Sequence, residues 1–114
     1  MLATRLKAKH DELAASKLPP DEVAELLEAG AFLVDVRPKI QARFGIAPGA
    51  THISLFTLKR RLHELPRDRK IVLYCHSGAA AGKSKQILDS LGFDAFNAGG
   101  YKDVLQIVGA MNKK

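Results

Sequence analysis

The stretch KIVLYCHSGAAAG, residues 70–82, contributes most to the prediction of the fold. Its first five residues, Lys70 to Tyr74, form a mostly apolar run that is too short for a helix and is typical of a buried strand. We expect Cys75 to be the first residue beyond that strand, in a loop of small residues that opens a helix. Open parallel α/β sheets bind ligands outside the carboxyl ends of their strands. The stretch therefore predicts such a sheet, with Cys75 at its ligand-binding edge.

Helical and strand-like patterns alternate on both sides of this stretch. Apolar residues recur with helical spacing in some segments, and short apolar runs bounded by glycine or proline lie between them. This alternation is typical of the α/β class, in which helices cover a central parallel sheet. The expected strands are 31–35, 51–54, 70–74 and 93–97, and the expected helices are 21–29, 56–65, 80–91 and 101–108.

Length and composition indicate a single domain. The chain has 114 residues, of which 46% are hydrophobic, and this is enough for one packed core. We expect the domain at residues 18–110, a helical extension at 1–17 and a frayed tail at 111–114. The leucines of the extension share one side, so this helix either packs on the domain or binds a partner.

Other features limit the compartment and the chemistry. No apolar run approaches the ~20 residues of a membrane-spanning helix, and the N-terminus lacks the apolar stretch of a signal peptide. We therefore expect a cytoplasmic protein with no membrane partner. One cysteine forms no internal disulfide, and the four histidines are scattered, which predicts no metal site. The cysteine is either a buried small hydrophobe or a working thiol.

A local basic patch contributes much of the net charge of +6. Residues 59–70 hold six Lys or Arg residues against Glu64 and Asp68. They lack the interleaved aromatic residues that proteins binding single-stranded nucleic acid use. We therefore expect a solvated or anion-attracting surface and no nucleic-acid partner.

The loop after the strand has the composition of an anion-binding loop. Backbone N–H groups can converge there, and the N-terminus of the following helix adds about half a positive charge. Gly78 permits backbone conformations that other residues avoid, and Ser77 and the alanines leave the N–H groups accessible. These features favour an anion on or near the sulfur, and we expect the Cys75 side chain to be partly exposed. The alternative is a cysteine that only packs beneath the helix.

Two other loop chemistries fit the residues poorly. Residues 77–84, SGAAAGKS, look like the GxxxxGK[ST] phosphate loop, but Ser77 stands where its first glycine belongs. A cysteine phosphatase needs an arginine six residues after the cysteine, and Ala81 occupies that position. Nucleotide hydrolysis and phosphatase activity are therefore not expected.

Four segments together resemble the rhodanese family of sulfurtransferases, in order and in spacing. They are Leu33–Arg37 (LVDVR), Gly45–Ala50 (GIAPGA), Ile71–Gly78 (IVLYCHSG) and Asn97–Tyr101 (NAGGY). The likeness extends from Leu18 to about Val108. It implies a rhodanese-like α/β domain whose central parallel β-sheet is flanked by helices on both faces.

The resemblance implies a rhodanese-type sulfurtransferase that works through a cysteine persulfide. Cys75 would be the catalytic nucleophile, and its persulfide would lie in a substrate-binding cradle formed by His76, Ser77, Gly78, Ala79 and Ala80. Asp35 and Arg37 would give structural support by bracing nearby loops. The donor would be thiosulfate or a persulfide, on a small molecule or a protein, and the acceptor would be a thiol or a cyanide-type nucleophile. No cofactor or metal is implied.

Two positions depart from the family pattern. The usual CxxGxR loop carries an arginine five residues after the cysteine, where this chain has Ala80. We expect this change to weaken the binding of thiosulfate, which carries two negative charges. The segment that usually holds a histidine before the Pro-Gly turn reads Gly45-Ile46 here, and we expect only local packing to change.

Two functions therefore remain open. The first is a sulfurtransferase or persulfide carrier that takes a sulfane sulfur on Cys75 and passes it to a thiophilic acceptor. The alternative is a catalytically weak rhodanese-like module that binds an anion or a protein. A protein partner would use the N-terminal helix or the basic segment 59–70.

Overall fold

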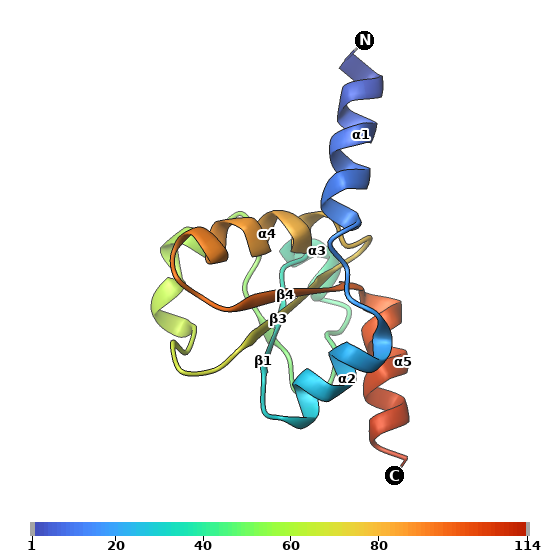
Figure 1. The fold of residues 1–114 in the computed structure, drawn as a ribbon, viewed down its shortest axis with the longest axis vertical. Coiled ribbons are helices and arrows are strands. Elements are labelled where there is room, and N and C mark those ends of the chain that lie inside the picture. Colours follow the sequence, from blue (N-terminus) through green and yellow to red (C-terminus); the bar gives the residue numbers. More distant parts are fainter. Residues whose placement is uncertain (1, 114) are drawn as a thin grey trace.

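The computed structural model describes residues 2–113 and shows a parallel sheet between helices (Figure 1), which confirms the predicted α/β class. Met1 and Lys114, which belong to the predicted extension and tail, lie outside the described residues. The helices are α1 (Leu2–Ala14), α2 (Pro20–Glu28), α3 (Lys39–Ala42), α4 (Ala79–Ser90) and α5 (Tyr101–Met111). The strands are β1 (Phe32–Asp35), β2 (Thr51–His52), β3 (Ile71–Cys75) and β4 (Ala95–Gly100), and two 3-10 turns, η1 (Leu58–Arg60) and η2 (Leu62–Glu64), precede β3.

The four strands run parallel in the order β2-β1-β3-β4, so β3 lies inside the sheet. Its side chains alternate between two apolar clusters. Ile71 and Leu73 belong to the cluster under α4, whereas Val72 and Tyr74 belong to the cluster under α2 and α5. Helices therefore cover both faces of the sheet, as predicted.

Burial fixes β3 and, with it, the position of the cysteine. All five residues of the strand are buried, and the first four have no exposed surface. Each aliphatic side chain removed from water contributes about 1.5–3 kcal/mol to stability. The end of β3 is therefore a rigid platform for the loop that follows it.

The predicted helix at 56–65 is wrong, because this segment forms the two separate 3-10 turns. Two contacts explain the difference. Leu58 and Leu65 are both buried in the cluster under α4, which pins the segment at its two ends. The Thr57 hydroxyl donates to the Ser54 carbonyl at 3.2 Å and competes with a regular helical start. So short a segment cannot offset the loss of these contacts with helical hydrogen bonds alone.

Several predicted element ends shift by a few residues. Cys75 is the last residue of β3 rather than the first residue beyond it. β4 continues through the predicted turn at 98–100, because Cys75 pairs with Gly100 after an irregularity in the register. α5 runs to Met111, which the prediction assigned to the frayed tail.

The N-terminal helix α1 projects away from the body of the molecule, and its C-terminal end lies against the start of α4 (Figure 1). The approach is close, since a Cβ atom on Gly82 would collide with the Leu13 backbone. Leu6 remains 62% exposed, however. The extension therefore contacts the domain through the C-terminal part of α1, including His10 and Leu13, and leaves its beginning exposed.

Candidate functional site

Cys75 ends β3, and its sulfur accepts hydrogen bonds from two backbone N–H groups. The Gly78 N–H donates to Sγ at 3.0 Å, and the Ala81 N–H donates to Sγ at 3.4 Å. Both donors belong to the turn that starts α4, so the helix N-terminus adds its partial positive charge. A loop of this form stabilises negative charge on a bound sulfur group.

The thiol is more buried than the sequence suggested. Cys75 is 3% exposed and joins the apolar cluster under α4, so the expectation of a partly exposed side chain is wrong. The reason is the strand end: Cys75 still belongs to β3, and α4 lies directly over its side chain. Little of Cys75 is therefore accessible from solvent.

Gly78 shapes the turn around the sulfur. It is the N-cap of α4 and has φ +93°, in the left-handed region that strongly favours glycine. A Cβ atom there would lie 3.4 Å from the Cα of Gly99, in van der Waals contact, so the backbone conformation is the main constraint. This conformation lets the Gly78 N–H point at Sγ while the chain turns into the helix.

The remaining cradle residues surround the sulfur at different depths. His76 and Ser77 are exposed, whereas Ala79 and Ala80 are half-buried in the first turn of α4. None of the five cradle residues is a lysine or an arginine. The structure thus brings all five predicted cradle residues to the loop, and their contact with a substrate stays a prediction.

A histidine from outside the domain reaches this loop. His10 lies in α1, and its Nε2 forms a 3.0 Å hydrogen bond with the Ser77 hydroxyl. Nothing in the local sequence pattern connects two residues 67 positions apart, so His10 was missed. Its position makes α1 a neighbour of the candidate site.

Asn97 joins the cysteine loop to the N-terminal segment. The side chain has no exposed surface, and its Nδ2 donates to the Gly78 carbonyl and to the Ser16 hydroxyl, each at 2.9 Å. Its Oδ1 accepts from the Gly99 N–H at 2.8 Å. The sequence placed Asn97 at a strand end without revealing its bond to Ser16, which is 81 positions away in the chain.

Asp35 and Arg37 form a buried ion pair at the end of β1. Nε and Nη2 of Arg37 donate to Asp35 Oδ2 at 2.9 and 2.8 Å, and Nη2 also donates to the Gly45 carbonyl at 2.6 Å. Burial alone would lower the pKa of Arg37, but the hydrogen bonds and the charge of Asp35 raise it. The guanidinium lies 4.1 Å from the ring centre of Tyr101. The pair thus ties the loop after β1 to the start of α5.

Tyr74 and Asp103 hold two further parts of the backbone near the site, at Ala47 and at Gly100. The Tyr74 hydroxyl accepts from the Ala47 N–H at 2.8 Å, and burial raises its pKa, so it stays protonated. Asp103 Oδ2 accepts from the Gly100 N–H at 3.0 Å and from Lys17 Nζ at 3.2 Å. The Gly100 hydrogen bond, together with Lys17, lowers the pKa of Asp103.

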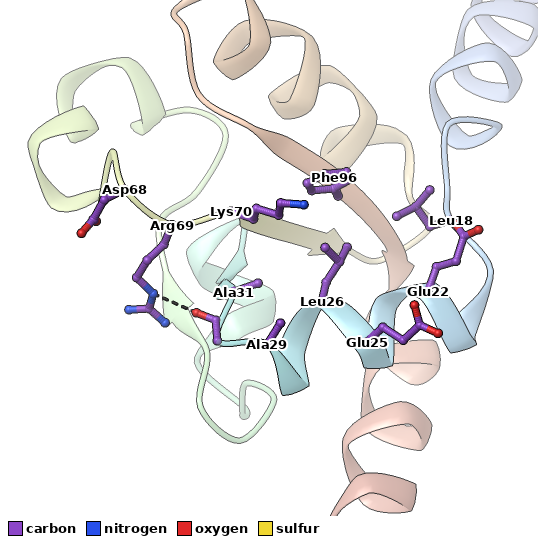
Figure 2. Close-up of a pocket in the computed structure, with 11 residues that line it drawn as sticks. Leu18, Glu22, Glu25, Leu26, Ala29, Ala31, Asp68, Arg69, Lys70 and Phe96 are labelled. Carbon is purple, nitrogen blue, oxygen red and sulfur yellow. Dashed lines mark hydrogen bonds between the residues drawn. The ribbon is translucent and has the colours of Figure 1, made fainter.

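A cavity of about 550 Å³ lies elsewhere in the molecule (Figure 2). Its lining includes Glu22 and Leu26 of α2, Phe96 of β4 and Lys70 at the start of β3. Because β3 begins there and ends at Cys75, the cavity is at the opposite edge of the sheet. None of its lining residues belongs to the cysteine loop.

Residues 2–113 offer neither a metal-binding cluster nor a membrane-spanning helix. No three His, Cys, Asp or Glu side chains gather closely enough there to hold a metal ion. None of the helices in that range combines the length with the apolar character that crossing a bilayer requires.

Fold and site together define a class: a small parallel α/β domain in which one cysteine ends a central strand and receives backbone N–H groups from the helix that follows. The chain belongs to the family of the rhodanese-like domain, whose model matches residues 19–112. The resemblance drawn from the four sequence segments is therefore confirmed, and so is the rhodanese-like fold.

Relatives of known class include sulfurtransferases. The thiosulfate sulfurtransferase PspE of Escherichia coli is 34% identical over 79 residues, which is 67% of this chain and 76% of that protein. A sulfurtransferase of Allochromatium vinosum is 33% identical over 62 residues, 54% of this chain and 58% of its own length. The general class of rhodanese-like sulfurtransferases is supported by these relatives.

Another relative is a longer protein, and only a part of it is similar to this chain. The HTH-type transcriptional regulator Rv0324 of Mycobacterium tuberculosis is 49% identical over 63 residues, 50% of this chain but 28% of the regulator. The matched part of this chain thus covers less than two thirds of the length of some relatives. Among solved structures, the human single-domain sulfurtransferase TSTD1 is 27% identical with a TM-score of 0.66, covering 79% of this chain and 95% of that one.

Proposed function

We propose that this protein is a sulfurtransferase in which Cys75 carries the transferred sulfur as a persulfide. The observation that carries the proposal is the pair of backbone N–H groups donating to Sγ at 3.0 and 3.4 Å. Donors fixed in this way stabilise negative charge at no cost of reorganisation during the reaction. Membership of the rhodanese-like domain family, with sulfurtransferases among the relatives, supports the same chemistry.

The reaction consists of two half-reactions. The Cys75 thiolate attacks the sulfane sulfur of a donor, a new S–S bond forms, and the donor leaves with the electron pair of the bond that breaks. A thiolate or cyanide then attacks the outer sulfur of the persulfide, and the electron pair of that S–S bond returns to Cys75. No electrons enter or leave the cycle, so no redox cofactor takes part.

The cradle favours donors with little charge. Ala80 stands where a rhodanese loop usually has arginine, and the first turn of α4 offers an anion backbone dipoles alone. A missing charge-assisted hydrogen bond weakens binding by about 1.5–3 kcal/mol. The natural donor is therefore a persulfide on a small thiol or a protein, and thiosulfate is a poor one.

A second function has one observation in its favour. Cys75 packs within the apolar cluster under α4, as a cysteine with a purely structural role would. In that case the loop binds an anion or the domain binds a protein, and no sulfur is transferred. The sulfurtransferase is preferred because an inert buried cysteine does not explain two N–H groups directed at its sulfur.

Transfer rates with several donors test the proposed function. The purified protein is given thiosulfate, glutathione persulfide or cysteine persulfide with cyanide as acceptor, and thiocyanate is measured. We expect turnover with the persulfides, slower turnover with thiosulfate, and none for Cys75→Ser, whose fold is checked by circular dichroism. Equal turnover by a folded Cys75→Ser variant would overturn the proposal.

A further inference from the structure

Three large apolar side chains are exposed in the segments that follow β1 and β2, one of them in the short helix α3. Phe44 and Phe56 are each 81% exposed, and Ile40 is 68% exposed. We call these three residues the apolar rim. Burying a side chain of this size contributes about 1.5–3 kcal/mol, yet the described part of the chain leaves all three in water. Large apolar side chains left exposed along one edge of a small domain indicate an interaction site.

The apolar rim lies at the same edge of the sheet as Cys75. Phe44 precedes Gly45, whose carbonyl accepts a hydrogen bond from Arg37 just beyond β1. Phe56 follows Leu55, whose N–H donates to the Val36 carbonyl at 3.1 Å. Because β1, β2 and β3 are parallel, the loops that follow them share one edge, and Cys75 ends β3 there.

The surroundings of the rim carry one sign of charge. Between Asp35 and Glu64 the sequence has no acidic residue. The exposed basic side chains in that interval are Lys39, Arg43, Lys59 and Arg60, and the Arg43 guanidinium lies 4.9 Å from the ring centre of Phe44. Apolar contact area inside a basic border complements a partner surface that is acidic and apolar.

We propose that the apolar rim docks an acidic segment of a protein that exchanges sulfur with Cys75. The inference rests on the proposed function and names the partner class for it. A docked protein holds its own cysteine against the loop at residues 76–80, which suits a Cys75 residue that is only 3% exposed. The predicted basic segment 59–70 contributes only its first residues to this surface, because the rim belongs to the loops before it.

The composition of the rim favours a protein over a nucleic acid. Single-stranded RNA is held by stacking of bases on aromatic rings along a basic groove. Ile40, the third member of the rim, cannot stack on a base, whereas it packs readily against the leucine or valine of a protein. RNA is therefore the competing partner that the experiment must distinguish from a protein.

The test compares peptide acceptors with a small acceptor. Cys75 is loaded with sulfur from cysteine persulfide, and the loss of persulfide is followed by intact-mass spectrometry after adding a thiol. The acceptors are an acidic peptide with one cysteine between leucines and glutamates, a matched peptide with lysine for glutamate, and 2-mercaptoethanol. At low salt we expect the acidic peptide to react about tenfold faster than the lysine peptide, with the ratio falling as salt rises.

Variants separate the rim from the chemistry. The double variant Phe44→Ser with Phe56→Ser should slow transfer to the acidic peptide by about tenfold, corresponding to lost apolar contact, and leave 2-mercaptoethanol unaffected. Leu91→Ser is the matched control, because Leu91 is 41% exposed beyond the end of α4 and away from the rim. It should leave both rates unchanged.

The test distinguishes a failure of the proposed function from a failure of the docking inference. A protein that never accepts sulfur overturns the proposed function and this inference with it. A protein that loads but shows equal rates for both peptides, or a double variant that slows both classes of acceptor alike, overturns the inference alone. Suppression of transfer to the acidic peptide by an equal concentration of unstructured RNA, lost in the double variant, would assign the surface to nucleic acid instead.

Discussion

Single residues in the cysteine loop determine where the donors point. Gly78 has φ +93°, and its N–H is the nearer of the two donors to Sγ. Any side chain at this position both strains the backbone and moves the donor. The glycine was predictable from the sequence because turns of this kind need it, but the burial of Cys75 was not, since it depends on how α4 lies over the strand.

Gly78→Ala should therefore reduce both stability and transfer. A non-glycine residue in the left-handed region loses about 1–2 kcal/mol of stability. Gly49→Ala is the control, because Gly49 has φ +81° and nothing within 4 Å of its Cβ position, away from the sulfur. Urea unfolding should show a similar loss in both variants, whereas transfer should fall only in Gly78→Ala. Full transfer by that variant would argue against a role for the loop donors.

The missing arginine gives a second prediction at this scale. Ala80→Arg places a guanidinium in the first turn of α4 beside the cradle. We predict that turnover with thiosulfate rises by about 10- to 150-fold relative to turnover with a persulfide. Ala110→Arg adds the same charge on exposed α5 and should change neither rate. No gain for Ala80→Arg would show that loop charge does not select the donor.

Elements of the fold meet at the site through a few long-range contacts. The parallel strands and their order along the chain follow from short apolar runs between helical patterns, and those elements were predicted. The segment 56–65 was not, because buried Leu58 and Leu65 outweigh its helical pattern. The contacts of His10 and Asn97 also escaped prediction, since side-chain partners more than 60 residues apart leave no local signal.

Asn97 gives the prediction at the scale of elements, because its side chain connects β4, the cysteine loop and the segment after α1. Asn97→Ala leaves the buried Gly78 carbonyl without this partner, which should lower the free energy of unfolding by about 1–3 kcal/mol. Asn112→Ala, at the exposed end of α5, is the control and should change it by less than about 0.5 kcal/mol. Thermal and urea unfolding measure both. A neutral Asn97→Ala would contradict the assigned connection.

The whole molecule places its chemistry at one edge of the sheet. The Cys75 loop, the Asp35–Arg37 pair and the apolar rim all follow carboxyl ends of strands. Asp103 at the start of α5 fastens this edge to Lys17, just beyond α1, so the body of the domain and its N-terminal extension are electrostatically linked. That link gives the stability of the molecule a predictable dependence on pH.

Asp103 should stabilise the fold above its ordinary pKa of 3.8 and lose this effect in acid. Its folded pKa is lowered by the Gly100 N–H and by Lys17, so the unfolded chain takes up the proton first as the pH falls. Because the side chain is 40% exposed, the contribution is modest, about 0.5–1 kcal/mol. Unfolding of the natural protein and of Asp103→Asn should differ at pH 7 and converge below pH 3.8. A constant difference across this range would contradict the assignment.

The most direct test of sulfur transport by Cys75 is an intact-mass measurement after brief exposure to cysteine persulfide. We predict that the protein gains the mass of one sulfur atom, that the gain is absent from Cys75→Ser, and that adding cyanide removes it with the release of one thiocyanate. A natural protein that gains no sulfur while its single thiol remains free would contradict the account and leave the domain as a binding module.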